Sequence, residues 1–375
     1  MNKNSPGALS VKMKIFSSLP ECCRSPVLAV LLAAFLFGLN APLSKSLLLR
    51  GISPLFMVAF LYLGAGVGMF LLERLTDERK KEAPLSRKEM PWTVSMILLD
   101  VLAPLLLMLG LKLTSAANAS LLLNFEMAAT SLAAFCLFHE AVGKRMWLSL
   151  GVITAASLLL SVDFSAAGEG GGGGWNFSYG SLLVLAACGC WGLENNCTRN
   201  MSEKSPAQIV VVKGFGSGGT ALALAWLLKD PLPDSFSGIL ASLLLGFVAY
   251  GLSIFCYVKA QRHLGAARTS AYYAAAPFLG VLLSMLILQE IPSWHFLPAA
   301  LLMAWGVWLA VHEKHSHEHR HEALSHNHAH RHPDLHHTHV HVPPVTGWHA
   351  HEHVHAPCVH THAHTPDTHH RHSHP

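Results

Sequence analysis

Long apolar runs alternate with short polar segments along the first 311 residues of the chain. A run of about 17 or more apolar residues crosses a bilayer as an α-helix, because a helix satisfies every backbone group inside lipid. The pattern predicts ten such spans, at 26–47, 54–73, 91–111, 115–138, 146–162, 179–198, 207–228, 238–258, 267–289 and 293–311.

The ten spans consist of one five-span pattern that occurs twice along the chain. FGLNAPLSK at Phe37–Lys45 returns as WGLENNCTR at Trp191–Arg199, and Leu113–Glu140 aligns without a gap on His263–Glu290. The partners are 154 and 150 residues apart, so one five-span unit is duplicated. Because five is odd, the second copy enters the membrane from the opposite side, which makes an inverted repeat of the kind that gives alternating access in transporters.

The duplication divides the chain into two repeats with flanking segments. We expect an all-α membrane protein of ten transmembrane helices, followed by a disordered tail. The predicted parts are an N-terminal segment at 1–25, a first repeat at 26–162, a Gly-rich external linker at 163–178, a second repeat at 179–311 and a His-rich tail at 312–375.

Lys and Arg are concentrated in every second connection between the predicted spans. The N-terminal segment and every second loop hold 17 Lys and Arg, whereas the opposite connections hold 3. By the positive-inside rule, both termini are expected in the cytoplasm. The net charge of +4 therefore reflects topology and indicates no nucleic-acid partner. Only 13% of residues are charged, about half the share usual in a soluble protein.

The chain resembles the EamA-domain transporters of the drug/metabolite transporter superfamily. The resemblance covers 26–311 and rests on paired halves, helix-ending Glu140 and Glu290, and three segments: WGLENNCTR, QIVVVKG and HLGAARTSAYYAAAPFLG. These segments are similar to a bacterial subgroup that also has a His-rich C-terminal tail. The resemblance implies a ten-helix transporter in the inner (plasma) membrane of a bacterium. The chain departs from the family in one respect. A proline-bearing helix at this point of the repeat is common in the family, but here only the second half has one, because Pro277 corresponds to Met127 in the first half.

Ionisable residues inside the spans are the candidates for function. A charge in mid-bilayer costs about 2.5–3.5 kcal/mol on insertion scales, so such residues are rare and usually functional. Asp100 and Glu126 fall near the middle of the third and fourth spans, and Glu194 and Lys213 fall in the cytoplasmic parts of the sixth and seventh. Asp100 is a candidate for coupling or substrate contact.

Glu126 belongs to a predicted stripe along one helix. Asn118, Leu122, Glu126 and Thr130 are spaced by four, which places them on one face. Low-dielectric surroundings favour the neutral form of a carboxyl group, which suits proton coupling or cation binding. The alternative is a carboxyl group that only ties helices together by hydrogen bonds.

Two further pairs are expected near the cavity or its entrance. Glu194 and Lys213 lie at similar depth, so they can form an ion pair that is either a cytoplasmic gate or a static clamp. Tyr272 and Tyr273 are candidates for lining a substrate cavity, or they are packing residues.

The tail contains 24 of the 27 histidines. Neutral imidazole is a good ligand for Zn, Ni, Co and Cu, so the tail is predicted to bind divalent metal as a buffer or sensor. A pH-responsive polycation and a tail without function are the alternatives, since imidazole titrates at about pH 6.5. The candidate ligands are His326, His328, His330, His336, His337, His339, His341, His360, His362, His364, His369, His370, His372 and His374.

Together these features predict a secondary transporter that exports a small metabolite or amino-acid-like solute. One alternative is a divalent-metal (Zn, Ni or Co) transporter fed or gated by the tail, and another is a non-transporting membrane metal sensor or store. No catalytic residue, nucleotide motif or cofactor needed for transport is expected. The predicted partners are the lipid bilayer, a small-molecule or ion substrate and metal ions on the tail, and a homodimer is left open.

Overall fold

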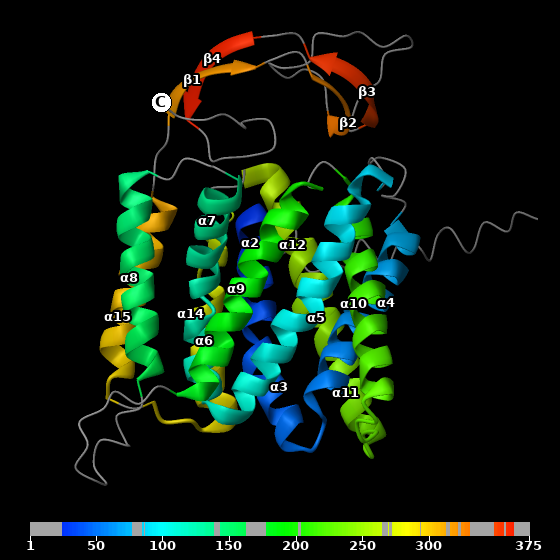
Figure 1. The fold of residues 1–375 in the computed structure, drawn as a ribbon, viewed down its shortest axis with the longest axis vertical. Helices are drawn as coiled ribbons and strands as arrows, with labels where there is room; N and C mark the ends of the chain where they lie inside the picture. Colours follow the sequence, from blue (N-terminus) through cyan, green and yellow to red (C-terminus); the bar gives the residue numbers. More distant parts are fainter. Residues whose placement is uncertain are drawn as a thin grey trace, which may run out of the picture.

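The computed structural model describes most of the apolar part of the chain and four short pieces of the tail. The described residues are 25–76, 85, 87–138, 143–162, 178–201, 204–264, 269, 272–292, 294–312, 316–321, 324–330, 349–355 and 358–363. The helical part forms a bundle whose helices run roughly along one direction (Figure 1).

The apolar runs form helices. In the first half these are α2 (Pro26–Gly38), α3 (Asn40–Leu49), α4 (Pro54–Thr76), η3 (Arg87–Glu89), α5 (Met90–Leu113), α6 (Ala116–Leu122), α7 (Phe125–Phe138) and α8 (Lys144–Ser161). In the second half they are α9 (Tyr179–Arg199), α10 (Pro206–Leu227), α11 (Phe236–Leu245), the π-helix η5 (Gly246–Leu252), α12 (Ser253–Leu264), α14 (Ala276–Leu288) and α15 (Phe296–Val311).

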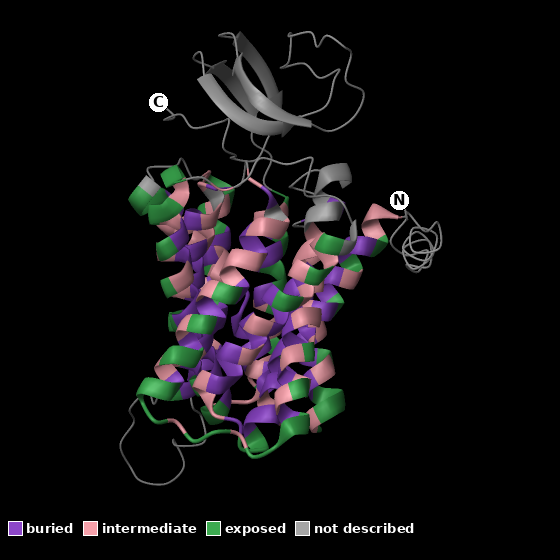
Figure 2. Cartoon of the chain, turned by 90° about the vertical axis from the view of Figure 1, so that its right-hand side faces the viewer, coloured by how far each residue is buried: buried purple, intermediate pink, exposed green. Residues whose placement is uncertain are grey.

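Several of these helices suit a membrane. Six described helical segments are long and apolar enough to cross one, and α14 and α15 are shorter apolar helices. Large apolar side chains such as Leu71, Trp226 and Leu286 are exposed on the outside of the bundle, while buried positions run through its middle (Figure 2). The outer surface is therefore apolar, as contact with lipid requires.

The predicted spans are not all single helices. Leu39 interrupts the first span between α2 and α3, because Pro42 has no N–H to bond the carbonyl of Gly38. The fourth span is broken at Leu123 and Asn124. At this break the backbone hydrogen bonds join residues three apart instead of four. The side-chain amide of Asn124 also donates to the Leu121 carbonyl at 3.1 Å.

The residues of the predicted polar stripe, Asn118, Leu122, Glu126 and Thr130, are divided between two helices, and Asn118 and Glu126 both contact α9. Asn118 and Leu122 belong to α6, whereas Glu126 and Thr130 belong to α7. The side chain of Asn124 binds a carbonyl that a continuous helix uses internally, so the two helices are separate.

The two ends of the bundle hold different connections. The end of α8 and the start of α9, which flank the predicted linker, lie at the bottom of Figure 1, while α15 ends at the top. Residues 163–177 themselves lie outside the described residues.

Four described pieces of the tail are strands, and apart from His312 the rest of the segment predicted to be disordered lies outside the described residues. β1 (Ser316–His321) pairs with β4 (Cys358–Ala363), and β2 (Leu324–His330) pairs with β3 (His349–His355), both antiparallel. Alternating sequences such as SHEHRH and HAHEHVH have the period of two that a strand needs, and backbone pairing between strands requires no packed core.

Candidate functional site

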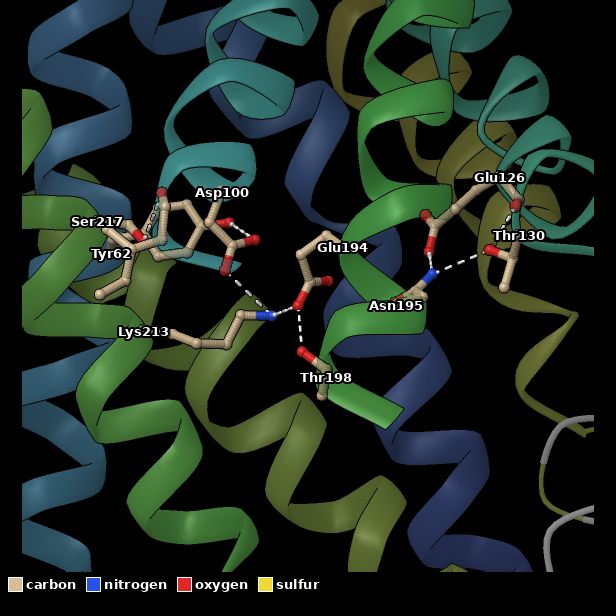
Figure 3. A network of polar contacts seen from close by, with 10 residues as sticks. Tyr62, Asp100, Glu126, Thr130, Glu194, Asn195, Thr198, Lys213 and Ser217 are labelled. Carbon is tan, nitrogen blue, oxygen red and sulfur yellow. Dashed lines mark hydrogen bonds and ion pairs between the residues drawn. The ribbon is translucent and has the colours of Figure 1, made fainter. Parts of the chain in front are cut away.

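One ionic cluster lies where α4, α5, α9 and α10 meet (Figure 3). Lys213 Nζ of α10 is 2.9 Å from Glu194 Oε1 of α9 and 3.2 Å from Asp100 Oδ2 of α5. Tyr62 of α4 donates its hydroxyl to Asp100 Oδ1 at 3.0 Å. Asp100 and Glu194 are 0% and 2% exposed, so the cluster is inside the bundle. We call Tyr62, Asp100, Glu194 and Lys213 the Lys213 cluster.

Close helix packing positions Lys213. The next residue, Gly214, lies so near α4 that a Cβ there would be 2.3 Å from the Cα of Gly66. Small residues let helix backbones approach in this way, and this approach brings the lysine to the interior face of α10. On α9, Thr198 donates its hydroxyl to Glu194 one turn away, which fixes that carboxylate.

The Lys213 cluster has one cation for two carboxyl groups. Two charges taken out of water are stabilised only when they are paired and hydrogen-bonded, and here Lys213, Thr198 and Tyr62 supply those contacts. The second carboxyl group leaves the cluster one negative charge in excess when both are ionised. Such a cluster is suited to accept a proton or another cation.

A second polar cluster lies on the adjacent side of α9. Asn195 Nδ2 donates to Glu126 Oε1 at 2.8 Å and lies 3.2 Å from Thr130 Oγ1, both on α7 (Figure 3). The Asn196 amide donates to the Thr130 carbonyl at 3.1 Å. Glu126, Thr130 and Asn195 are partly buried. We call these three residues the Glu126 cluster.

The two clusters are neighbours because consecutive residues of α9 belong to them. Glu194 faces Lys213 and Asn195 faces Glu126 (Figure 3). Gly192 makes the second contact close, since a Cβ at this position would be 2.7 Å from the backbone of Ala129 on α7. The structure therefore brings Asp100, Glu194 and Lys213 together in one cluster, and Glu126 and Thr130 in the other.

Asn118 is in neither cluster. Its amide donates to Thr114 Oγ1, the Leu160 carbonyl and Ser181 Oγ at 3.1, 3.2 and 3.0 Å, which ties α6 to α8 and α9. These contacts are those of a residue that holds helices together.

The two predicted tyrosines have different surroundings. The ring of Tyr273 lies 4.9 Å from that of Tyr257 and 5.9 Å from that of Phe37, and its hydroxyl is 3.4 Å from Ser253 Oγ. Tyr272 is 40% exposed. Tyr273 is thus part of an aromatic group inside the bundle, and Tyr272 is not.

Sequence reasoning did not select Asn40, Tyr62, Asn195 or Tyr250. Asn40 Nδ2 donates to the Tyr250 hydroxyl at 3.0 Å, and the rings of Tyr250 and Tyr62 are 5.5 Å apart, which connects this pair to the Lys213 cluster. The duplication contained a usable signal for Asn40, because it occupies the repeat position of Glu194.

An ionic contact between the halves lies away from both clusters. Glu290, after α14, accepts hydrogen bonds from the N–H groups of Ala116 and Ala117 at 3.0 Å each, so it caps the first turn of α6. Lys45 Nζ is 3.1 Å from Glu290 Oε1 and donates to the Thr114 carbonyl. A carboxylate at a helix N-terminus is favourable because of the helix dipole.

The predicted metal ligands lie only partly in described residues. His326, His328 and His330 belong to β2, and His360 and His362 belong to β4. His336, His337, His339, His341, His364, His369, His370, His372 and His374 lie outside the described residues. Where side chains are described, no group of three or more His, Cys, Asp and Glu is arranged to hold a metal ion.

Comparisons with known proteins point to one family. The EamA-like transporter family matches residues 24–162 and again 178–312. An uncharacterized transporter of Methanothermobacter thermautotrophicus is 27% identical over 289 residues, which are 70% of this chain and 79% of that protein. A crystal structure with 19% sequence identity superposes with a TM-score of 0.53 over 76% of this chain and 96% of its own, which shows a shared fold.

Proposed function

The chain belongs to the EamA-like transporter family and is an integral membrane protein, and from that premise we propose that it exports a small metabolite or amino-acid-like solute. It does so as a secondary transporter in the inner membrane of a bacterium. Ten transmembrane helices in two inverted repeats rock about a central site, with both termini in the cytoplasm.

One observation carries this proposal: an apolar bundle encloses two polar clusters that meet at α9. Buried ionisable groups are costly in a membrane protein, and they mark substrate or ion pathways. Both clusters join helices of the first half, α5 or α7, to α9 of the second half. A movement of one half against the other therefore changes their contacts.

The helix breaks support the inverted-repeat part of the proposal. α7 begins at Phe125 and α14 begins at Ala276. With the 150-residue spacing of the repeat, these two helix starts differ by only one residue. Discontinuous helices at matching positions of two halves are characteristic of transporter binding sites.

We assign different roles to the two clusters. Glu126 contacts the solute or the coupling ion, with Thr130 and Asn195 beside it, and Tyr273 contributes to the wall of the cavity. Asp100 shares in coupling, because it pairs with Lys213 in competition with Glu194. Glu194 and Lys213 form the cytoplasmic gate.

The His-rich tail has a regulatory role in this proposal: it binds divalent metal ions and reports their concentration to the transporter. The support is its composition, since imidazole is a good ligand for Zn, Ni, Co and Cu.

Transport in proteoliposomes tests the role of Glu126. A thermal-shift screen of amino acids, nucleosides, sugars and divalent metals first identifies a ligand, because ligands that bind the folded state raise its stability. Uptake of that ligand is then measured over a pH series for the wild type and for Glu126→Gln. The amide keeps an oxygen that accepts from Asn195, so the variant is expected to fold but to lose its pH-dependent transport.

Glu89→Gln is the matched control. Glu89 lies at the start of α5 and pairs with Lys204 at 3.7 Å, away from both clusters. Its variant is expected to transport like the wild type. Normal, pH-dependent transport by Glu126→Gln would remove the coupling role of Glu126, and a protein that moves no solute or metal in any condition would overturn the transporter proposal.

A further inference from the structure

Glu290 joins the two halves of the bundle at a place that belongs to neither polar cluster. It follows α14 of the second half, and it accepts hydrogen bonds at 3.0 Å each from the N–H groups of Ala116 and Ala117, at the start of α6 in the first half. Lys45 Nζ of α3, also in the first half, is 3.1 Å from Glu290 Oε1. The side chains of Lys45 and Glu290 are only 17% and 16% exposed, so salt screens this ion pair weakly. We call these four residues the Glu290 contact.

The Glu290 contact lies at one end of the bundle. α15 begins shortly after Glu290 at the bottom of Figure 1, and it ends at the top. The bottom is also where α8 ends and α9 begins. With both termini in the cytoplasm, as we propose, this is the outer end. Glu194 and Lys213 close the cytoplasmic side in the same proposal, so alternating access needs a second gate at the outer end.

The backbone next to Glu290 is strained. Gln289 ends α14 with a φ of 54°, in the left-handed region that residues other than glycine rarely adopt. Glu290 reaches α6 directly after this turn. A left-handed residue with a side chain persists where surrounding contacts hold it, and such residues are frequent in segments that switch between two conformations. Release of Glu290 from α6 therefore lets the turn at Gln289 relax.

The interface behind the Glu290 contact is tight but contains an unsatisfied hydroxyl group. A Cβ at Gly280 of α14 would lie 2.8 Å from Ser120 Oγ of α6 and 3.3 Å from the carbonyl oxygen of Gly38 on α2. Ser120 is 1% exposed, and its hydroxyl has no hydrogen-bond partner among the described residues. Buried polar groups in folded proteins are usually hydrogen-bonded, so an exception requires an explanation. Water can bond this hydroxyl once α6 and α14 separate, which lowers the cost of opening the interface.

We propose that the Glu290 contact is the outer gate of the transporter. When it is formed, α14 of the second half is held against α3 and α6 of the first half, and the outer end is closed. When it breaks, α14 moves away from α6, and Ser120 becomes accessible from outside. This inference rests on the proposed alternating access and goes beyond it, since the proposed function assigns only the cytoplasmic gate.

Accessibility of position 120 from outside tests the gate without any knowledge of the solute. Ser120→Cys introduces a thiol there in the full chain. Intact cells and inside-out vesicles are treated with a charged methanethiosulfonate reagent that does not cross the membrane. Peptide mass spectrometry then measures labelling of the introduced thiol separately from that of the eight native cysteines. Cys197, which is buried near the C-terminal end of α9, reports general unfolding.

Two variants in this background break the Glu290 contact in different ways. Glu290→Gln removes the charge that pairs with Lys45 but keeps an oxygen that accepts from the N–H groups of α6. Lys45→Met removes the cation and leaves the carboxylate on α6. Asp234→Asn is the matched control, because Asp234 is an exposed carboxyl group just before α11, at the same end of the bundle (Figure 1).

In intact cells, the introduced thiol is expected to be labelled at least tenfold faster in Glu290→Gln and Lys45→Met than in the parent and in Asp234→Asn, with Cys197 unlabelled throughout. Equal rates in all four proteins, or faster labelling only in inside-out vesicles, would overturn the outer gate. If Glu290→Gln also labels Cys197, that variant has unfolded and Lys45→Met decides. A gate response in a protein that moves no solute in proteoliposomes would overturn the proposed export and leave the gate in place.

Discussion

The Lys213 cluster and the Glu126 cluster share α9 but stabilise their carboxyl groups in different ways. Asp100 and Glu194 are almost fully buried and contact a cation, whereas Glu126 is partly buried and contacts the neutral amide of Asn195. An ionic contact in low dielectric is strong and costly to break, while an amide leaves the carboxyl group free to take another partner. The difference suggests a clamp or gate on one side of α9 and a solute or ion contact on the other.

Removing the cation should have the largest effect. Lys213→Met leaves two buried carboxyl groups without their charged partner, and breaking a buried pair in this way costs about 3–5 kcal/mol. We expect a large fall in the midpoint of thermal unfolding in detergent. The triple variant Lys213→Met, Asp100→Asn and Glu194→Gln removes the charges together and should recover much of that loss. A single variant as stable as the wild type would show that the ionic contact is not a clamp.

Removing the neutral partner should have an intermediate effect. Asn195→Ala deletes the amide that donates to Glu126 Oε1, and an unsatisfied buried group costs about 1–3 kcal/mol. The loss should be smaller than for Lys213→Met, because partly buried Glu126 can bind water. Asn196→Ala is the control, since it removes an amide of the same helix that bonds backbone carbonyls only. Thermal unfolding with transport assays tests whether only Asn195→Ala alters transport.

Removing one hydroxyl should have the smallest effect. Thr130→Val keeps the shape of the side chain but loses its bonds to the Glu126 carbonyl and the Asn195 amide. Each of these two hydrogen bonds contributes about 0.5–1.5 kcal/mol, so a decrease in stability smaller than that of Lys213→Met is expected. Ser131→Ala, which loses only a bond to the Met127 carbonyl, provides the reference. A loss as large as that of Lys213→Met would contradict the distinction between the clusters.

Parts of both clusters could be predicted from the sequence. Asp100, Glu126, Glu194 and Lys213 are exceptional because they are ionisable inside apolar runs, and Glu194 and Lys213 lie at similar depth. Tyr62 and Asn195 gave no such signal, since a tyrosine or asparagine in a helix has many ordinary roles. The break between α6 and α7 was also missed, because the four-residue spacing assumed one helix and Asn124 interrupts it.

The tail shows the same limit. Its alternating histidines indicate extended chain and metal affinity, but the alternation is equally compatible with a flexible segment. Which strands pair, and in which register, depends on backbone contacts between segments such as β1 and β4 that are remote in the chain.

The amino-acid sequence by itself determined where helices form and that the chain contains one unit twice, because apolar length and repetition are local properties. The tertiary structure decided which carboxyl group meets Lys213, which meets Asn195, and that Glu290 caps α6. These contacts depend on how each helix is rotated against neighbours that are distant in sequence. Close backbone approaches, such as Gly66 to Gly214 and Gly192 to Ala129, set that rotation.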